Sequence, residues 1–300
     1  MRKFAQYLIF VLIGVAILDV FNRICMSFAY YHLPADSELM REFKYISDSD
    51  AELLIIGASR GVYDYNAGMI SDSLHVSCQI IAKEGMSVIS QYISVKKAIE
   101  IGKVKTIIYD LSSSQLSDDW VENQTGTYYP FYWKNQDVMS FVEEQQGRWM
   151  KYLLLSSFVQ YNSTLYDIVY FGYMKKTADK NGFVPLKYTG IPFQEDESVD
   201  TMYIIRINPT GEHYLKKIIN ICKENSIRLI LCDSPRVHSK NQVFDIYLAE
   251  LAAKNQIEFW NYSDYKPISS DMRYFVDPVH INGPAADIFT GAIIDRLRNP

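Results

Sequence analysis

The sequence predicts an α/β fold in which helices cover a parallel β-sheet, preceded by a membrane-spanning helix. Short apolar runs alternate with stretches of helical spacing, a pattern typical of parallel strands joined by crossover helices. The alternation stops near residue 116 and resumes at Asn208. Of the 300 residues, 48% are hydrophobic and 22% are charged, which is enough apolar material for a sizeable core.

The N-terminal segment FAQYLIFVLIGVAIL follows two basic residues. A helix from Phe4 to about Phe21 would span roughly 27 Å, just short of a ~30 Å hydrocarbon core. Asp19 would lie near the far membrane face, and no small-x-small cleavage pattern follows. We therefore predict an uncleaved signal-anchor and linker over residues 1–35, single-pass in the cell membrane. The basic end lies inside and the remaining chain lies on the periplasmic or extracellular side. A buried soluble helix is the alternative.

The first half of the predicted sheet follows. The segment AELLIIGAS, residues 51–59, reads as a buried strand, and residues 76–85 read as a second strand. Residues 87–103 carry apolar side chains at helical spacing and a glycine near the end, which favours a helix. Residues 105–113 form the third predicted strand.

Residues 116–206 interrupt this pattern and are too long for a bare loop in a compact domain. We predict one domain over residues 36–300 in which this mostly helical insertion forms a cap over a site. The run from Met150 to Met174 is apolar in part, but polar residues interrupt it. An amphipathic helix pair is therefore favoured over a second membrane span.

The second half of the sheet begins after Asn208, where a helix with proline near its first turn is expected. Residues 228–235 are a predicted strand, 241–256 a helix and 257–264 a further strand. Pro284 lies near the start of a final helix.

Charge and cysteine usage narrow the function classes. The net charge is −5 and the interior holds no basic block, which argues against a nucleic-acid partner. Cys25, Cys78, Cys222 and Cys232 show no CxxC pair and no zinc spacing. We predict buried free thiols, with a Cys222–Cys232 disulfide as the alternative.

Three residue types needed for serine acyl chemistry occur at the two ends of the domain. Ser59 follows the first strand, where doubly wound sheets place their sites. Asp277 precedes His280 by three residues, so one tight turn would let the carboxylate orient the imidazole. A sheet with its first strand in the centre would bring these ends together. The alternatives are that Ser59 is a helix N-cap, Asp277 a turn cap and His280 a structural histidine.

These residues resemble the SGNH (GDSL-like) hydrolase superfamily. The first block reads Gly57-Ala58-Ser59-Arg60 and the last reads Asp277-Pro278-Val279-His280-Ile281-Asn282-Gly283. The resemblance covers roughly residues 50–115 and 208–298. It is strongest to membrane-anchored envelope members, and more distant to the D-alanine-transfer and alginate acetylation proteins. It implies a flavodoxin-like three-layer sandwich, a Ser59–His280–Asp277 triad, and no metal or organic cofactor.

The resemblance also implies an oxyanion site. The amides of Ser59 and Gly85 match the first two donors of the family. The family's third block carries an asparagine, whereas residues 110–115 here read DLSSSQ. Ser112 or Gln115 would have to replace it, because losing one such donor costs about 100- to 1000-fold in rate.

Polar residues after the strands are candidates for substrate binding. Arg60 would meet an anionic polymer, pair with Asp64, or lie in solvent. Asp233, Arg236 and His238 follow the strand at 228–235 and would line the cleft or simply finish the strand.

The resemblance implies a membrane-anchored serine esterase or O-acyltransferase acting on acyl esters of an envelope glycan, or on a small ester. It allows a multi-span acyltransferase as partner. One alternative is a non-catalytic envelope protein that binds polysaccharide or an acyltransferase partner, with its sugar surface in the aromatic insertion. Another is a two-carboxylate glycosidase, although no acid spacing singles out a pair.

Overall fold

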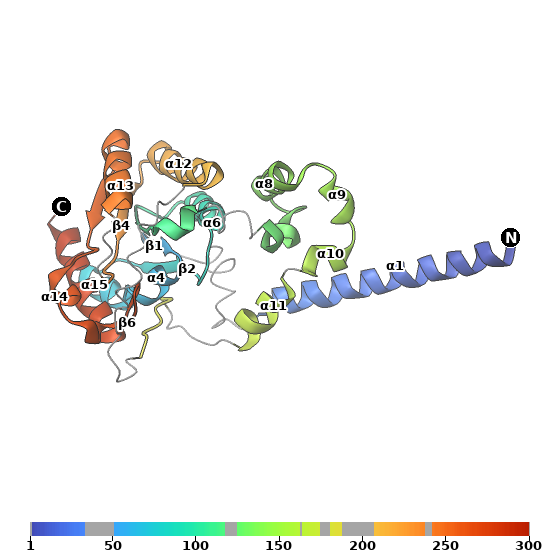
Figure 1. Cartoon of the computed structure of the whole chain (residues 1–300), viewed down its shortest axis with the longest axis horizontal. Coiled ribbons are helices and arrows are strands. Elements are labelled where there is room, and N and C mark those ends of the chain that lie inside the picture. Colours follow the sequence, from blue (N-terminus) through green and yellow to red (C-terminus); the bar gives the residue numbers. More distant parts are fainter. Residues whose placement is uncertain are drawn as a thin grey trace. The chain divides into compact units, whose positions relative to one another are not determined.

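The computed structural model describes residues 2–33, 51–117, 125–162, 164–174, 181–187, 207–237 and 242–299 (Figure 1). The chain forms two compact units. Met1–Leu39 and Glu122–Lys176 make up the first, here called the helical unit. Met40–Val121 and Thr177–Pro300 make up the second, here called the sheet unit.

A five-stranded sheet forms the centre of the sheet unit, in the order β2-β1-β3-β4-β5. All neighbouring strands are parallel, which confirms the predicted α/β class. Its strands are β1 (Leu53–Gly57), β2 (Cys78–Ala82), β3 (Thr106–Asp110), β4 (Arg228–Asp233) and β5 (Glu258–Asn261). The middle strand is β3, and β1 is an interior strand flanked by β2 and β3.

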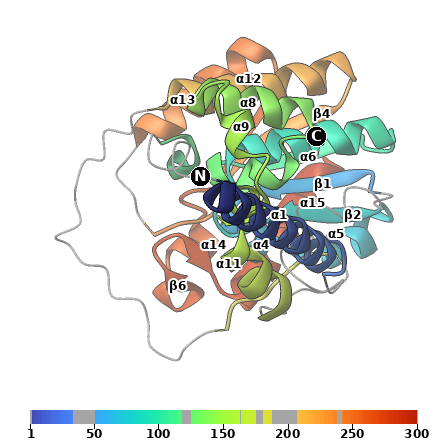
Figure 2. The same ribbon diagram turned by 90° about the vertical axis from the view of Figure 1, so that its right-hand side faces the viewer.

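Helices cover both faces of the sheet, as Figures 1 and 2 show. The helices α6 and α12 pack together on one face, and α5 and α15 pack together on the other. Their bounds, with that of α13, are α5 (Ala67–Leu74), α6 (Val88–Ile101), α12 (Pro209–Glu224), α13 (Gln242–Asn255) and α15 (Gly283–Arg298). Every β1 residue is buried, so the strand lies between two apolar layers as a continuous apolar run predicts.

Local capping explains where these helices begin. The Ser87 hydroxyl accepts from the Ser90 amide at the start of α6. The Asn208 and Asn282 side chains likewise accept from backbone amides at the starts of α12 and α15, and each of these helices has a proline in its first turn. Asn282 therefore fixes the start of α15 directly after the predicted Asp-x-x-His block.

Several elements of the sheet unit were not predicted. The short helix α4 (Ser59–Tyr63) follows β1, and a small antiparallel pair joins β6 (Phe275–Asp277) to β7 (His280–Ile281). Two further short elements precede that pair, α14 (Lys266–Ser269) and η5 (Met272–Tyr274). Elements of two to five residues are too short to show a hydrophobic period, so only packing reveals them.

The helical unit combines the N-terminal helix with part of the insertion. Helix α1 (Arg2–Tyr31) extends beyond the predicted end near Phe21. It is long and apolar enough to cross a membrane. The run at 150–174 forms short segments in place of the predicted helix pair. The short segment η1 (Ser113–Leu116) belongs to the sheet unit and precedes the insertion. The insertion segments in order are η2 (Thr125–Phe131), α8 (Gln136–Gln146), α9 (Met150–Leu153), α10 (Ser157–Asn162), α11 (Leu165–Asp167) and η3 (Ile168–Met174). The predicted cap role stays a prediction.

All four thiols are free. Cys78, Cys222 and Cys232 are buried, whereas Cys25 on α1 is exposed. The alternative of a Cys222–Cys232 disulfide is therefore wrong for this structure.

Candidate active site

Ser59 lies at the carboxyl end of β1, which ends at Gly57. It is the first residue of α4, whose N-cap position is Ala58 and whose first turn receives no side-chain cap. The N-cap interpretation of Ser59 is therefore wrong, and its hydroxyl points to another partner. That partner comes from the far end of the chain.

The β6–β7 turn holds Asp277 and His280 in a fixed mutual orientation. One carboxylate oxygen of Asp277 accepts from the backbone amides of Val279 (2.9 Å) and His280 (3.0 Å). The other oxygen lies 2.7 Å from His280 Nδ1. The turn amides thus anchor the carboxylate while its free oxygen orients the imidazole ring, which leaves Nε2 for a second partner.

The second partner of the imidazole is the serine hydroxyl. Ser59 Oγ lies 2.7 Å from His280 Nε2, within the reach that a nucleophile and its general base require. The Tyr63 ring meets the His280 ring edge-on, with centroids 5.5 Å apart. The His280 side chain is 17% exposed and that of Asp277 is 43% exposed. The structure therefore joins all three predicted residues in one partly accessible chain of contacts.

The ionised form of Asp277 is stabilised in this turn. Burial alone would raise its pKa, but the hydrogen bonds from the His280 ring and the two turn amides outweigh burial. The pKa of Asp277 therefore lies below its usual value of 3.8. A carboxylate that stays ionised can hold the imidazole through a proton transfer.

We expect the stabilisation from Asp277 to disappear in acid. Because the folded pKa is lowered, this contribution is present above the unfolded pKa near 3.8 and is lost as pH falls through the folded value. Chemical denaturation of the wild type and Asp277→Asn would measure it. The difference in unfolding free energy between them should shrink below about pH 4. A difference that stays constant down to about pH 3 would contradict the assignment.

The predicted oxyanion residues follow the strands on either side of β1. Gly85 follows β2 and has a positive φ of 70°, a conformation that favours glycine. Ser112 follows β3, and its Oγ lies 2.9 Å from Ser114 Oγ. Because all three strands are parallel, these loops leave the same edge of the sheet as Ser59.

Gln115 faces the interior instead. Its side chain is 1% exposed, and its amide nitrogen donates to Ser112 Oγ at 3.2 Å. Its amide oxygen accepts from Gln91 at 2.9 Å, and Gln91 in turn accepts from the Tyr109 hydroxyl. Burial and these partners hold the Gln115 amide within the protein. We therefore do not assign Gln115 to the oxyanion site.

The predicted substrate contacts of Arg60 and Asp233 need correction. Arg60 is only 4% exposed and Asp233 only 1%. Arg60 Nη1 lies 2.7 Å from Asp233 Oδ1, and Arg60 Nη2 lies 2.7 Å from Asp110 Oδ1. Arg60 therefore joins the ends of β1, β3 and β4 from inside the protein, and a buried guanidinium with two carboxylates has no free face for a polymer.

A second arginine, Arg236, and one further aspartate, Asp245, extend this cluster. Arg236 pairs with Asp233 at 3.1 Å and with Asp245 at 2.8 Å. The Arg236 side chain is only 13% exposed. These contacts favour the alternative in which Asp233 and Arg236 end the strand over the one in which they line a substrate cleft. His238, the remaining predicted substrate contact, lies outside the described residues.

Asp64 links the cluster to the turn that carries His280. It is fully buried, accepts from Ser234 Oγ at 2.9 Å, and lies 3.4 Å from the Ile281 amide. Burial raises its pKa well above the usual range, the Asp110 charge acts in the same direction, and Arg60 opposes both. Burial and the neighbouring Asp110 carboxylate therefore both favour the protonated form of Asp64.

Sequence reasoning weighed Asp64 as a partner of Arg60, but it placed neither Asp64 nor Asp110 in a buried cluster. A signal was present, because the runs IIYD and LILCD each end a buried strand on aspartate. Parallel strands bring those ends to one edge, where a buried arginine after the first strand would be their counter-charge.

A surface hollow elsewhere in the sheet unit is lined by residues 261–267 and contains none of the three contact residues. It lies at the end of β5 and at the start of α14, on residues that no prediction singled out. The arrangement of Ser59, His280 and Asp277 is therefore the candidate site.

No protein-family model matches the chain, and no curated protein matches it. Similar solved structures include a GDSL-like lipase from Bacteroides thetaiotaomicron VPI-5482, at 10% identity and a TM-score of 0.41. That match covers 85% of this chain and 98% of the lipase. An acetyl xylan esterase, AlAXEase, matches at 10% identity and a TM-score of 0.39, covering 82% of this chain and 98% of the esterase. The likeness concerns the fold, and the chemistry rests on the contacts above.

Proposed function

We propose that this chain is a serine esterase or O-acyltransferase with an SGNH-type Ser-His-Asp triad. The observation that carries the proposal is the continuous contact from Ser59 Oγ through the His280 ring to Asp277, with 2.7 Å at each step. A hydroxyl alone is a weak nucleophile, and an adjacent oriented base is what activates it.

The reaction follows from these three groups. Ser59 Oγ bonds to the carbonyl carbon of an ester while His280 Nε2 takes the hydroxyl proton, and Asp277 stabilises the imidazolium that forms. The C–O bond to the alcohol then breaks, and His280 returns the proton to the departing oxygen. Water, or a hydroxyl group of an acceptor, attacks the acyl-serine by the same route in reverse.

The developing oxyanion needs hydrogen-bond donors that are already in place. We assign this role to the backbone amides of Ser59 and Gly85, with the Ser112 hydroxyl as the third donor. The β2 and β3 loops that carry Gly85 and Ser112 flank the end of β1, which supports the assignment. None of these steps requires a metal or an organic cofactor.

We further propose that α1 anchors the enzyme in the cell membrane, with the sheet unit on the periplasmic or extracellular side. The basic residues before the apolar segment support this orientation. A membrane-held enzyme outside the cytoplasm meets acyl esters of envelope glycans, which we propose as the substrate class. A multi-span acyltransferase as donor partner belongs to the same proposal.

We expect a fluorophosphonate probe to label the full chain on a single serine, Ser59, because only an activated hydroxyl attacks phosphorus readily. Peptide mass spectrometry would locate the adduct. Labelling should disappear in Ser59→Ala and persist in Ser270→Ala, which removes an exposed hydroxyl elsewhere in the sheet unit. A folded wild type that is not labelled would favour the non-catalytic binding protein.

We expect Asp277→Asn to lower the rate of ester hydrolysis by about 10⁴-fold with little change in the fold, because the amide favours the wrong imidazole tautomer. Hydrolysis of a short-chain chromogenic ester by the purified full chain would measure the effect. Asp295→Asn, at an exposed position of α15, is the matched control and should keep wild-type activity. A loss below about tenfold in Asp277→Asn would remove Asp277 from the triad.

A further inference from the structure

The C-terminal half of α1 is held to the insertion by a row of polar contacts. The Asp19 carboxylate accepts from Ser156 Oγ at 2.7 Å and from the Ser157 amide at 2.8 Å. One turn later, Arg23 donates to the Leu155 carbonyl and to Gln160 Oε1 at 2.7 Å. These contacts place the α9–α10 connection beside residues 19–23 of α1, which fixes its level, that is, its position along the α1 axis.

The part of α1 that precedes these contacts is too short to cross a membrane alone. From Phe4 to Leu18 the helix is exposed and apolar, but this stretch is only about 22 Å long at about 1.5 Å per residue. A bilayer has a hydrocarbon core of about 30 Å. If α1 spans, the level of Asp19 must therefore lie at or slightly inside the membrane boundary.

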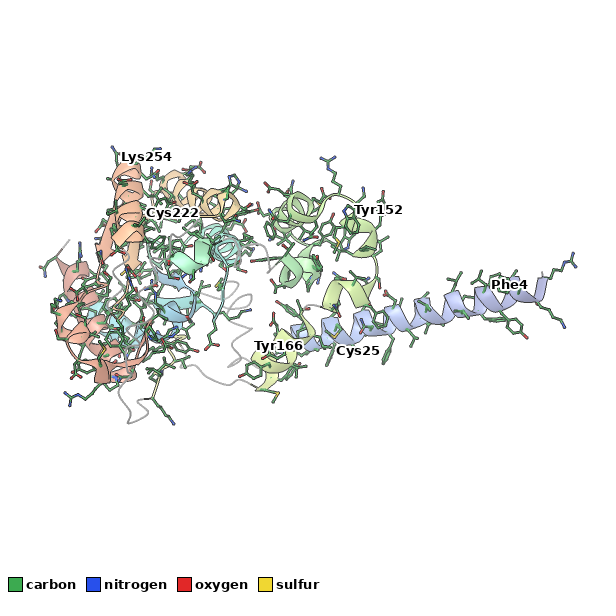
Figure 3. The ribbon with its side chains drawn as sticks, viewed as in Figure 1. Phe4, Cys25, Tyr152, Tyr166, Cys222 and Lys254 are labelled. Carbon is green, nitrogen blue, oxygen red and sulfur yellow. The ribbon has the colours of Figure 1, made fainter. Side chains whose placement is uncertain are left out.

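The insertion presents apolar side chains to solvent at this same level. We call them the α9–α10 surface: Trp149 (57% exposed), Tyr152 (67%), Leu153 (43%), Leu155 (62%) and Phe158 (51%). Figure 3 shows Tyr152 pointing outward from α9, on the side from which the free half of α1 extends. Exposed apolar residues gathered in one place mark an interaction site.

We infer that the α9–α10 surface docks into the headgroup region of the same membrane that α1 enters. The inference rests on the proposed anchoring of α1 and adds to it a second, peripheral contact with lipid. It accounts for the short apolar part of α1, because the exposed apolar surface lies beside α1 near Asp19 and would meet lipid there. The Ser156 hydroxyl and the Ser157 amide meanwhile donate to the Asp19 carboxylate, which reduces the cost of holding this charge near lipid.

The composition of the surface fits a lipid interface. Tryptophan and tyrosine are enriched where a membrane meets water, and basic side chains reach from there toward lipid phosphates. Lys151 lies over the Tyr152 ring at 5.0 Å, and the Arg148 side chain is 89% exposed beside Trp149. Aromatic, aliphatic and basic groups therefore occur together in a single short stretch of chain.

Depth-resolved quenching in vesicles tests this inference. Cys25 is the one exposed native thiol, so Cys25→Ser gives a background in which a single introduced cysteine can carry an environment-sensitive fluorophore. Leu155→Cys reports on the α9–α10 surface. Tyr166→Cys is the control, because residue 166 is similarly exposed and lies beside the C-terminal end of α1 (Figure 3).

The control position is farther from the membrane boundary along α1. Tyr173, on the segment that follows Tyr166, donates to the Ala29 carbonyl. Ala29 lies ten residues beyond Asp19, or about 15 Å along the helix. The two labels thus sit at two heights within the same unit.

The full chain would be reconstituted at high lipid excess into vesicles of phosphatidylcholine and phosphatidylglycerol. Nitroxide-labelled lipid with the spin group near the headgroup should reduce the emission at position 155 by about twofold or more, and that at position 166 by much less. Equal quenching at the two positions, or none at 155, overturns the inference. A label at 155 that is shielded from water yet not quenched by lipid also overturns it, because a second copy of the chain then covers the surface.

Separate measurements keep this result apart from the proposed function. Flotation of the vesicles reports whether α1 anchors the chain, and a chain that does not float overturns anchoring and docking together. Fluorophosphonate labelling of the same samples reports on Ser59. A floating, labelled protein without quenching at 155 would contradict only the docking of the α9–α10 surface.

Discussion

Ser59→Ala is expected to reduce ester hydrolysis by about 10⁴- to 10⁶-fold, leaving only the slow turnover that binding and oxyanion donors support. The loss should appear in kcat rather than in KM, because the hydroxyl bonds to the substrate carbon only during the reaction. Steady-state hydrolysis of a short-chain ester by the full chain in detergent would measure it. A transferase that releases acyl groups slowly to water should show the same loss with a hydroxyl acceptor present.

The Ser59→Ala variant should fold normally, because the Ser59 hydroxyl caps no helix in this structure. Thermal unfolding that matches the wild type would show this. Activity that survives within about tenfold would remove Ser59 as nucleophile and with it the triad. Ser270→Ala should retain full activity and provides the comparison.

Arg60→Leu is expected to destabilise the sheet unit by about 3–5 kcal/mol, because it leaves the buried Asp110 carboxyl without its cation and removes one of the two cations beside Asp233. Arg60 contacts Asp110 and Asp233 at 2.7 Å each, and all three side chains are at most 4% exposed. Denaturant unfolding of the full chain in detergent, followed by circular dichroism, would measure the loss. Arg60→Lys should lose less, since it keeps the charge but not the forked geometry.

Arg273→Leu is the matched control for this prediction. Arg273 also pairs with an aspartate, Asp271, but its side chain is 72% exposed. A solvent-exposed pair contributes about 0–1 kcal/mol, so this variant should unfold close to the wild type. Equal stability losses in the two variants would mean that burial of the Arg60 cluster does not set its contribution.

The two adjacent residues of the first helical turn thus have opposite surroundings. Ser59 meets His280 at the partly accessible edge, whereas Arg60 lies among the strand ends inside. The Asp64 carboxyl connects the two environments through its 3.4 Å approach to the Ile281 amide, next to His280. The buried charged cluster therefore contacts the turn that carries His280. The residues around Ser59 alone did not predict this contact.

Much of the sheet unit could be predicted because its information is local. The strands β1 to β4 contain short apolar runs, and Ser87, Asn208 and Asn282 each accept from an amide two or three residues further along the chain. The Asp277–His280 contact also closes within one turn. Such features depend on neighbours in sequence, so their residue types are enough to indicate them.

The amino-acid sequence by itself determined the α/β alternation, the order of elements along the chain, the apolar N-terminal helix and the Asp277–His280 turn. Only the tertiary structure decided that β3 is the middle strand, that Arg60 is buried among Asp110 and Asp233, and that α1 packs with insertion helices. It also placed Ser59 Oγ against His280 Nε2. The physical reason is distance along the chain: these contacts join segments far apart in sequence, and their free energy depends on which surfaces exclude water together.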